Sequence, residues 1–231
     1  MSQEILKLQT FLNTELRGES VCLLEAGCGS ASNINFGNNV RMVGIDISQK
    51  QLERNTTLHE KIVGDIQHYE FPSDSFDAIV CWDVLEHLPQ PQLALRQFAR
   101  AVKPGGIVIL KLPNVLSVKG LVTKLLPHSL HVLAYRYLYG DKTAGKNDTA
   151  PFKTFLRFSI SANAIRHLCD EDGLHQIFYA TYDVSSIGWL QRKKAAHFCY
   201  VVLLKLFGLL SLGGIGESEL IFVLKKYLRN E

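Results

Sequence analysis

The chain lacks most of the features that would assign it to a specialised class. Its 231 residues carry a formal net charge of only +3 with both signs spread along the sequence, which argues against a nucleic-acid-binding groove. The five cysteines are scattered and odd in number, so they form neither a disulfide framework nor a zinc motif. The N-terminus lacks the charged-then-apolar profile of a signal peptide. We therefore expect a cytoplasmic protein with reduced thiols and no nucleic-acid partner.

An uninterrupted apolar run long enough to span a membrane is also missing, because a span needs about 20 apolar residues. The most apolar stretch, residues 195–212, is interrupted by His197, Lys205 and Gly208 and follows the basic cluster 191–194. Two interpretations remain open. Residues 191–212 form either a peripheral contact with a membrane surface or a buried helix between the last two strands of a sheet.

What the sequence does contain is an alternation of strand and helix patterns. Short apolar runs predict strands at 21–24, 40–46, 62–63, 76–82 and 107–112. Helical spacing and capping residues predict helices at 4–16, 48–58 and 91–102. With 47% apolar residues the chain can build one sizeable core. We predict a single α/β domain over 1–231, with a mostly parallel sheet covered by helices on both faces.

A glycine-containing turn follows the first predicted strand. The order Glu25-Ala26-Gly27-Cys28-Gly29 gives a tight turn in which glycine permits positive φ and close approach of a ligand. Such a turn at the carboxyl end of a first parallel strand is typical of nucleotide binding. The Gly-x-Gly-x-x-Gly pattern of dinucleotide enzymes is incomplete, since residue 32 is serine, and this disfavours a nicotinamide-dependent oxidoreductase.

Acidic residues follow the next two predicted strands. Asp46 stands about twenty residues beyond the glycine turn, where a carboxylate can accept the hydroxyls of a ribose, and Asp65 follows the third strand. Each aspartate alone could be a helix cap or a turn residue. Their joint position at the ends of successive strands favours a binding site.

Taken in order, these motifs resemble those of class I S-adenosylmethionine-dependent methyltransferases. The resemblance covers about residues 21–114 and includes Glu25–Gly29, Gly44–Asp46, Gly64–Asp65, Phe76–His87 and Lys103–Gly106. It implies a Rossmann-like seven-stranded sheet whose last strand is antiparallel, with 175–182 as sixth strand and 219–225 as seventh. The implied cofactor-binding residues are Glu25, Gly27, Cys28, Gly29, Asp46, Ile47, Asp65, Ile66, Trp82 and Asp83.

Within this resemblance, Glu25, Gly27 and Gly29 would line the methionine end of the cofactor. Asp46 would hold the ribose and Asp65 the adenine amino group. Trp82 and Asp83 would form the rim beside the sulfonium.

Methyl transfer requires positioning of the acceptor and, for a hydroxyl acceptor, a base. Histidine has a suitable intrinsic pKa, and the candidates are His87, His131 and, less directly, His128. Asp83, Glu86 and His87 also form a candidate metal-ligand set if the chain turns helical there. The alternative is that Glu86 and His87 only order the loop, and we do not expect a metal cofactor.

Substrate choice is expected to depend on the segment beyond Asn114. We predict a core of 20–114 and 159–231 and a helical lid insertion over 115–158. Phe152, Phe155 and Phe158 recur at a spacing more typical of core than of a substrate pocket. The apolar lid favours a small, apolar or lipid-linked acceptor methylated at oxygen. A non-catalytic S-adenosylmethionine-binding protein is the main alternative, and the oligomeric state is left open.

Overall fold

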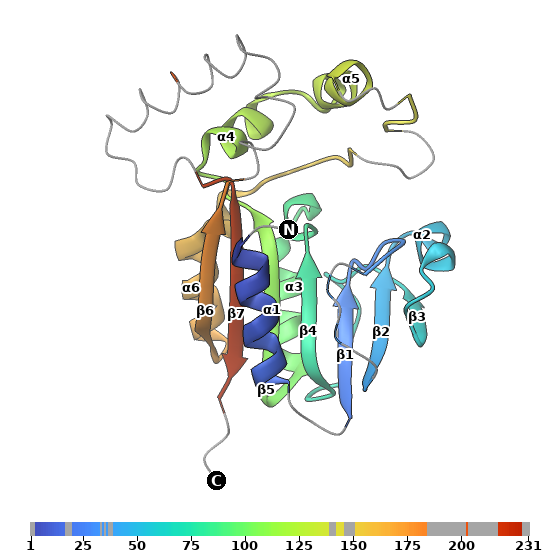
Figure 1. Ribbon diagram of the computed structural model, residues 1–231, viewed down its shortest axis with the longest axis vertical. Helices are drawn as coiled ribbons and strands as arrows, with labels where there is room; N and C mark the ends of the chain where they lie inside the picture. The colour runs from blue at the N-terminus through green and yellow to red at the C-terminus, as the bar shows by residue number, and fades with distance from the viewer. Residues whose placement is uncertain are drawn as a thin grey trace.

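The computed structural model describes residues 3–16, 20–32, 34, 36, 39–138, 142–145, 151–183, 202 and 217–227. Seven strands form one sheet in the order β3-β2-β1-β4-β5-β7-β6 (Figure 1). Neighbours from β3 to β5 pair in parallel, and β7 is antiparallel to both β5 and β6. The predicted seven-stranded sheet with a reversed last strand is therefore confirmed. The strands are β1 (Val21–Ala26), β2 (Val40–Asp46), β3 (Glu60–Val63), β4 (Phe76–Trp82), β5 (Val102–Pro113), β6 (Leu174–Tyr182) and β7 (Glu219–Lys226).

Helices cover both faces of the sheet, as Figure 1 shows. On one face, α1 (Gln3–Glu15) buries Leu8 and Leu12 against alternate residues of the central strands. On the other, α3 (Pro91–Ala101) and α6 (Ala162–Glu171) pack on the second apolar cluster. The central strands are buried on both faces, which explains why β1 and β4 are predominantly apolar.

The carboxyl ends of the parallel strands meet at one edge of the sheet, and the remaining elements lie at or above this edge (Figure 1). Helices α4 (Val118–Leu125) and α5 (His128–Leu138) follow β5 directly, in agreement with the predicted helical lid. Residues 151–157, here called the strap, return beneath them to the short helix η2 (Phe158–Ile160). The division of the chain into core and insertion stays a prediction.

Two local predictions need correction. Ser48 caps α2 (Gln49–Arg54) by accepting the Gln51 N–H, but the helix ends four residues before the predicted Leu58. It ends because Asn55 adopts an extended conformation. Strand β5 begins at Val102 and not at Ile107, and its register with β4 shifts between Phe76 and Ala78.

The prediction for residues 191–212 concerns a segment that, apart from residue 202, lies outside the described residues. Within the described part of the chain, no helix is long and apolar enough to cross a membrane.

Gly27 and Gly173 provide a matched test of how tightly the glycine turn is packed. Both have positive φ, +71° and +78°, so alanine is strained by about 1–2 kcal/mol at either position. A Cβ on Gly27 would lie 2.5 Å from a Val84 methyl, whereas nothing lies within 4 Å of one on Gly173. Urea unfolding should show Gly27→Ala to be more destabilising than Gly173→Ala by a further ~1–3 kcal/mol of overpacking. Equal losses would contradict the tight packing of the turn on Val84.

Candidate functional site

A cavity of about 720 Å³ opens at the carboxyl edge of β1, β2 and β4. It brings together three predicted regions: the glycine turn, the acids that follow β2 and β3, and the segment after β4. Eight of the ten predicted cofactor-binding residues line it, namely Gly27, Gly29, Asp46, Ile47, Asp65, Ile66, Trp82 and Asp83. The structure places these eight residues around one cavity. Their roles toward a ligand stay predictions.

Asp46 fixes the glycine turn to the end of β2. Its carboxylate accepts the Gly29 N–H at 2.9 Å through one oxygen and the Ser48 N–H at 2.8 Å through the other. A carboxylate offers about four lone-pair sites, so these two bonds leave capacity for hydroxyl donors. A Cβ on Gly29 would have no neighbour within 4 Å, and the residue lines the cavity. The turn is thus held open toward a ligand.

Glu25 and Cys28 do not line the cavity, in contrast to their predicted place in the cofactor site. Both are buried, Glu25 accepting the Ser32 hydroxyl and Cys28 lying close to Gly44. They support the turn from within.

Sequence reasoning missed Asn55, whose buried side chain also holds the glycine turn. Its amide lies 3.5 Å from the carbonyl of Cys28 and 3.4 Å from that of Gly29. An asparagine that ends a short helix has no signature to separate this role from ordinary capping.

Asp65 lines the cavity at the end of β3. Burial would raise the pKa of its carboxyl, but hydrogen bonds from Gln67 and His68 outweigh burial and lower the pKa. Asp65 is therefore ionised at neutral pH and can accept a donor such as an amino group.

The segment after β4 places His87 at the cavity with a defined proton arrangement. His87 belongs to the short helix η1 (Leu85–His87), and its Nδ1 lies 2.9 Å from the Lys153 carbonyl. A carbonyl can only accept, so Nδ1 carries the proton and Nε2 keeps its lone pair. Burial lowers the pKa of His87, which keeps the ring neutral. His87 is thus arranged as a proton acceptor.

The candidate metal set of Asp83, Glu86 and His87 does not form. Asp83 has a positive φ of +54° and pairs with Lys111, while Glu86 is buried and His87 bonds to the strap. The turn after β4 is a single 3-10 turn, so the side chains do not share a helix face. In the part of the chain that is described, no group of three histidine, cysteine or acidic side chains could hold a metal ion.

The strap closes one side of the cavity. Phe152, Lys153 and Phe155 line it, and the N–H groups of Phe155 and Leu156 donate to the Glu86 carbonyl at 2.8 and 3.0 Å. The expectation that the phenylalanines belong to the core is therefore wrong, because Phe152 and Phe155 line the cavity and Phe158 is 54% exposed. Their spacing could not reveal this, because the strap is extended and not helical.

His128 and His131 lie in α5 and do not line the cavity. Their rings are 6.4 Å apart, and each has a buried nitrogen without a hydrogen-bond partner among the described residues. Burial lowers the pKa of His131. Of the candidate bases, His87 is the one at the cavity.

Glu86 is a buried carboxyl beside the site, and one of its oxygens has no hydrogen-bond partner among the described residues. Burial, reinforced by the negative charge of Asp83, raises its pKa to about 8. Glu86 is therefore predominantly protonated at neutral pH.

The pKa of Glu86 predicts a pH-dependent cost. Between pH of about 4.5 and 8 the unfolded chain releases this proton and the native state keeps it, so stability falls as pH rises. Glu86→Gln should match the wild type near pH 4.5 and exceed it by about 1–3 kcal/mol near pH 7.5. Urea unfolding at both values measures this, with the exposed Glu60→Gln as control. An unchanged pH profile in Glu86→Gln would refute the assignment.

Comparison with known proteins agrees with this geometry. Residues 24–110 match the family model described as a methyltransferase domain. The 27-O-demethylrifamycin SV methyltransferase of Amycolatopsis mediterranei is 33% identical over 96 residues, which cover 36% of this chain and 35% of that protein. A ubiquinone biosynthesis O-methyltransferase of Ralstonia nicotianae is 33% identical over 149 residues, covering 55% and 61%. The chain thus spans less than two thirds of these relatives.

The fold agrees as well. Phosphoethanolamine N-methyltransferase 2 of Haemonchus contortus, solved with S-adenosyl-L-methionine, superposes with a TM-score of 0.58 at 16% identity, covering 96% of this chain and 52% of that one. The matched domain, the sheet topology and the ordered motifs around one cavity lead to one conclusion. Residues 24–110 therefore form a methyltransferase domain, and the chain as a whole has the fold of S-adenosylmethionine-dependent methyltransferases.

Proposed function

We propose that this protein transfers a methyl group from S-adenosylmethionine to an oxygen of a small, predominantly apolar acceptor. The observation that carries the proposal is the composition of a single cavity. One part of it is formed by the glycine turn, Asp46 and Asp65, and the other by His87 and the aromatic strap. A cofactor and an acceptor would therefore share one enclosed space.

The residues present fit the cofactor. Asp46 retains acceptor capacity for ribose hydroxyls, Asp65 is an ionised acceptor, and the exposed Ile47 offers an apolar surface to a base. When bound, the cofactor supplies an activated methyl group on a sulfonium. The chain's own contribution is to orient the acceptor and exclude water.

The acceptor side favours an apolar ring or chain that carries a hydroxyl. Trp82, Leu88, Phe152 and Phe155 supply apolar surface, and His87 Nε2 supplies the base that a hydroxyl requires. The relative from Ralstonia nicotianae is a ubiquinone biosynthesis O-methyltransferase, which supports oxygen as the acceptor atom. The basic cluster 191–194 and the apolar run 195–212 support peripheral contact with a membrane and a lipid-linked acceptor in a cytoplasmic protein.

Cofactor binding is tested by calorimetric titration with S-adenosylmethionine, S-adenosylhomocysteine and NAD. Micromolar binding of both sulfur compounds is expected, with at least a tenfold loss in Asp46→Ala, because the ribose hydroxyls lose their acceptor. Asp77→Ala, at the opposite end of the sheet, is the control. Binding of NAD alone would overturn the proposal. Binding of the sulfur compounds without product from any acceptor would favour a non-catalytic binding protein.

The role of His87 is tested with a phenolic acceptor selected by screening for S-adenosylhomocysteine formation. His87→Gln should lower kcat about 10²–10⁴-fold, the usual contribution of a general base. The pKa of His87 lies below the ordinary histidine value of about 6.5, so the ring becomes protonated only at pH values under 6.5. Wild-type activity should decrease in that acidic range. His131→Gln, outside the cavity, should retain activity. Equal losses in the two variants would remove His87 from the role of base.

A further inference from the structure

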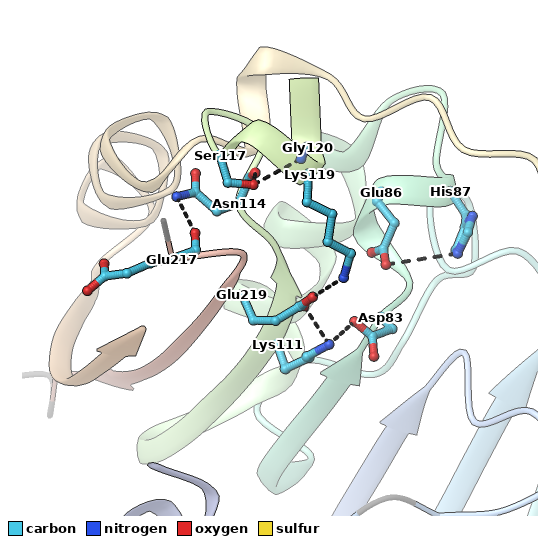
Figure 2. A network of polar contacts seen from close by, with 10 residues as sticks. All are labelled: Asp83, Glu86, His87, Lys111, Asn114, Ser117, Lys119, Gly120, Glu217 and Glu219. Carbon is cyan, nitrogen blue, oxygen red and sulfur yellow. Dashed lines mark hydrogen bonds and ion pairs between the residues drawn. The ribbon is translucent and has the colours of Figure 1, made fainter. Parts of the chain in front are cut away.

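A chain of alternating charges connects the cavity wall to the lid (Figure 2). Lys111 Nζ in β5 lies 2.5 Å from Asp83 and 2.7 Å from Glu219 at the start of β7. Lys119 Nζ in α4 lies 2.5 Å from the other oxygen of Glu219. The four side chains come from the segment after β4, from β5, from β7 and from α4. Sequence reasoning missed Lys111, Lys119 and Glu219, although Lys111 is the one charge within the apolar run 107–112.

The antiparallel register of β5 and β7 explains why the side chains of Lys111 and Glu219 meet. Lys111 pairs with Ile221, and Pro113 pairs with Glu219, so the two charged residues are diagonal neighbours on one face. Both are nearly fully buried, with side chains 9% and 3% exposed. Burial opposes the charge on Lys111, but Asp83 and Glu219 outweigh it and raise the pKa of the ammonium group. The ammonium group of Lys111 therefore stays charged inside the protein.

Stability alone gives no reason for this pair. Apolar residues of similar volume in place of a buried ion pair are often neutral or stabilising, and the flanking Leu110 and Leu112 are fully buried. Local rules are broken most often at functional sites. The position of Lys111 beside the cavity points in the same direction.

Lys111 holds Asp83 at two points. Its carbonyl accepts the Asp83 N–H at 2.8 Å, and its ammonium group binds the Asp83 carboxylate. Asp83 has a positive φ of +54°, a conformation that costs a non-glycine residue free energy unless its surroundings enforce it. Asp83 also lines the cavity next to Trp82. Lys111 thus fixes the conformation of a residue in the cavity wall.

Glu219 lies where α4 is fastened to the sheet. Asn114 donates its N–H to the Ser218 carbonyl at 2.8 Å and its side-chain amide to the Glu217 carbonyl at 3.0 Å. Ser117 donates its hydroxyl to the Asn114 carbonyl and accepts the Gly120 N–H, as a helix cap does (Figure 2). The Lys119–Glu219 ion pair completes this junction, so α4 and Lys111 bind the same carboxylate.

We propose that Lys111 and Glu219 are positioning residues that couple the docking of α4 to the geometry of Asp83 in the cofactor cavity. The inference rests on the proposed cofactor site. A cofactor that orders Asp83 strengthens the Lys111–Glu219 contact, and this contact holds Lys119 and with it α4. Because coupling is reciprocal, docking of α4 raises cofactor affinity by the same factor.

The experiment combines amide hydrogen exchange of residues 118–125 with calorimetric titration of S-adenosylmethionine. Lys119→Met removes the half-exposed end of the network with little risk to folding, and Glu219→Gln removes its centre. The control is Lys103→Met. Lys103 in β5 pairs with Asp77 in β4, near the amino end of β4 and far from the cavity.

In the wild type, S-adenosylmethionine should slow exchange of α4 about tenfold, within the usual range of coupling between sites. Lys119→Met and Glu219→Gln should speed this exchange in the free protein. In both variants the affinity for S-adenosylmethionine should fall. The fold-loss should equal the factor by which S-adenosylmethionine slows α4 exchange in the wild type. Lys103→Met should show neither effect.

Two results separate this inference from the proposed function. Wild-type binding of S-adenosylmethionine with no change in α4 exchange, or full affinity in Lys119→Met, overturns the coupling and leaves the cofactor site intact. Failure of the wild type to bind S-adenosylmethionine overturns both. A purely structural role for the ion pairs would speed α4 exchange in the variants without matching the two factors.

Discussion

The parallel pairing of β1 with both β2 and β4 is the constraint on which the rest of the site depends. The carboxyl ends of parallel strands lie at the same edge of the sheet. Residues that are distant in sequence but follow neighbouring strands therefore lie close together there. Gly29 and Asp46 are joined by one hydrogen bond because their strands run side by side. The loop of one strand is then held by the carboxylate of the next, and the cavity opens between them.

At this edge the chain accepts features that a core would exclude. Asp83 takes up a positive φ, Lys111 carries a charge among leucines, and Glu86 is buried with an unpaired oxygen in the described structure. Each feature costs free energy by itself. Together these features cost less free energy, because the Lys111 ammonium group binds the Asp83 carboxylate and protonation removes the charge of Glu86. The concentration of such features around one cavity distinguishes a site from a stability core.

Most of the fold and the cofactor side of the cavity could be predicted from sequence, because both follow local rules. Apolar runs, glycine turns and acids at strand ends determine where Gly27, Asp46 and Asp65 stand. Lys111 and Glu219 could not be paired in this way, because their contact depends on the antiparallel register of β5 and β7, more than 100 residues apart in sequence. Phe155 was assigned to the core because its spacing is ambiguous until the backbone is known to be extended.

The same division follows the boundary of the matched domain. The matched methyltransferase domain ends at residue 110. Phe152, Lys153 and Phe155, which line the cavity, lie beyond that point, as do Lys111, Lys119 and Glu219 of the network beside it. The cavity is thus lined by residues of the matched domain and by the strap, while α4 and β7 meet at the ion pairs of Glu219 beside it. In the turn after β4, Glu86 binds the strap through its carbonyl, and Asp83 binds Lys111, which pairs with Glu219 of β7. This turn therefore links the strap and the sheet at the wall of the cavity.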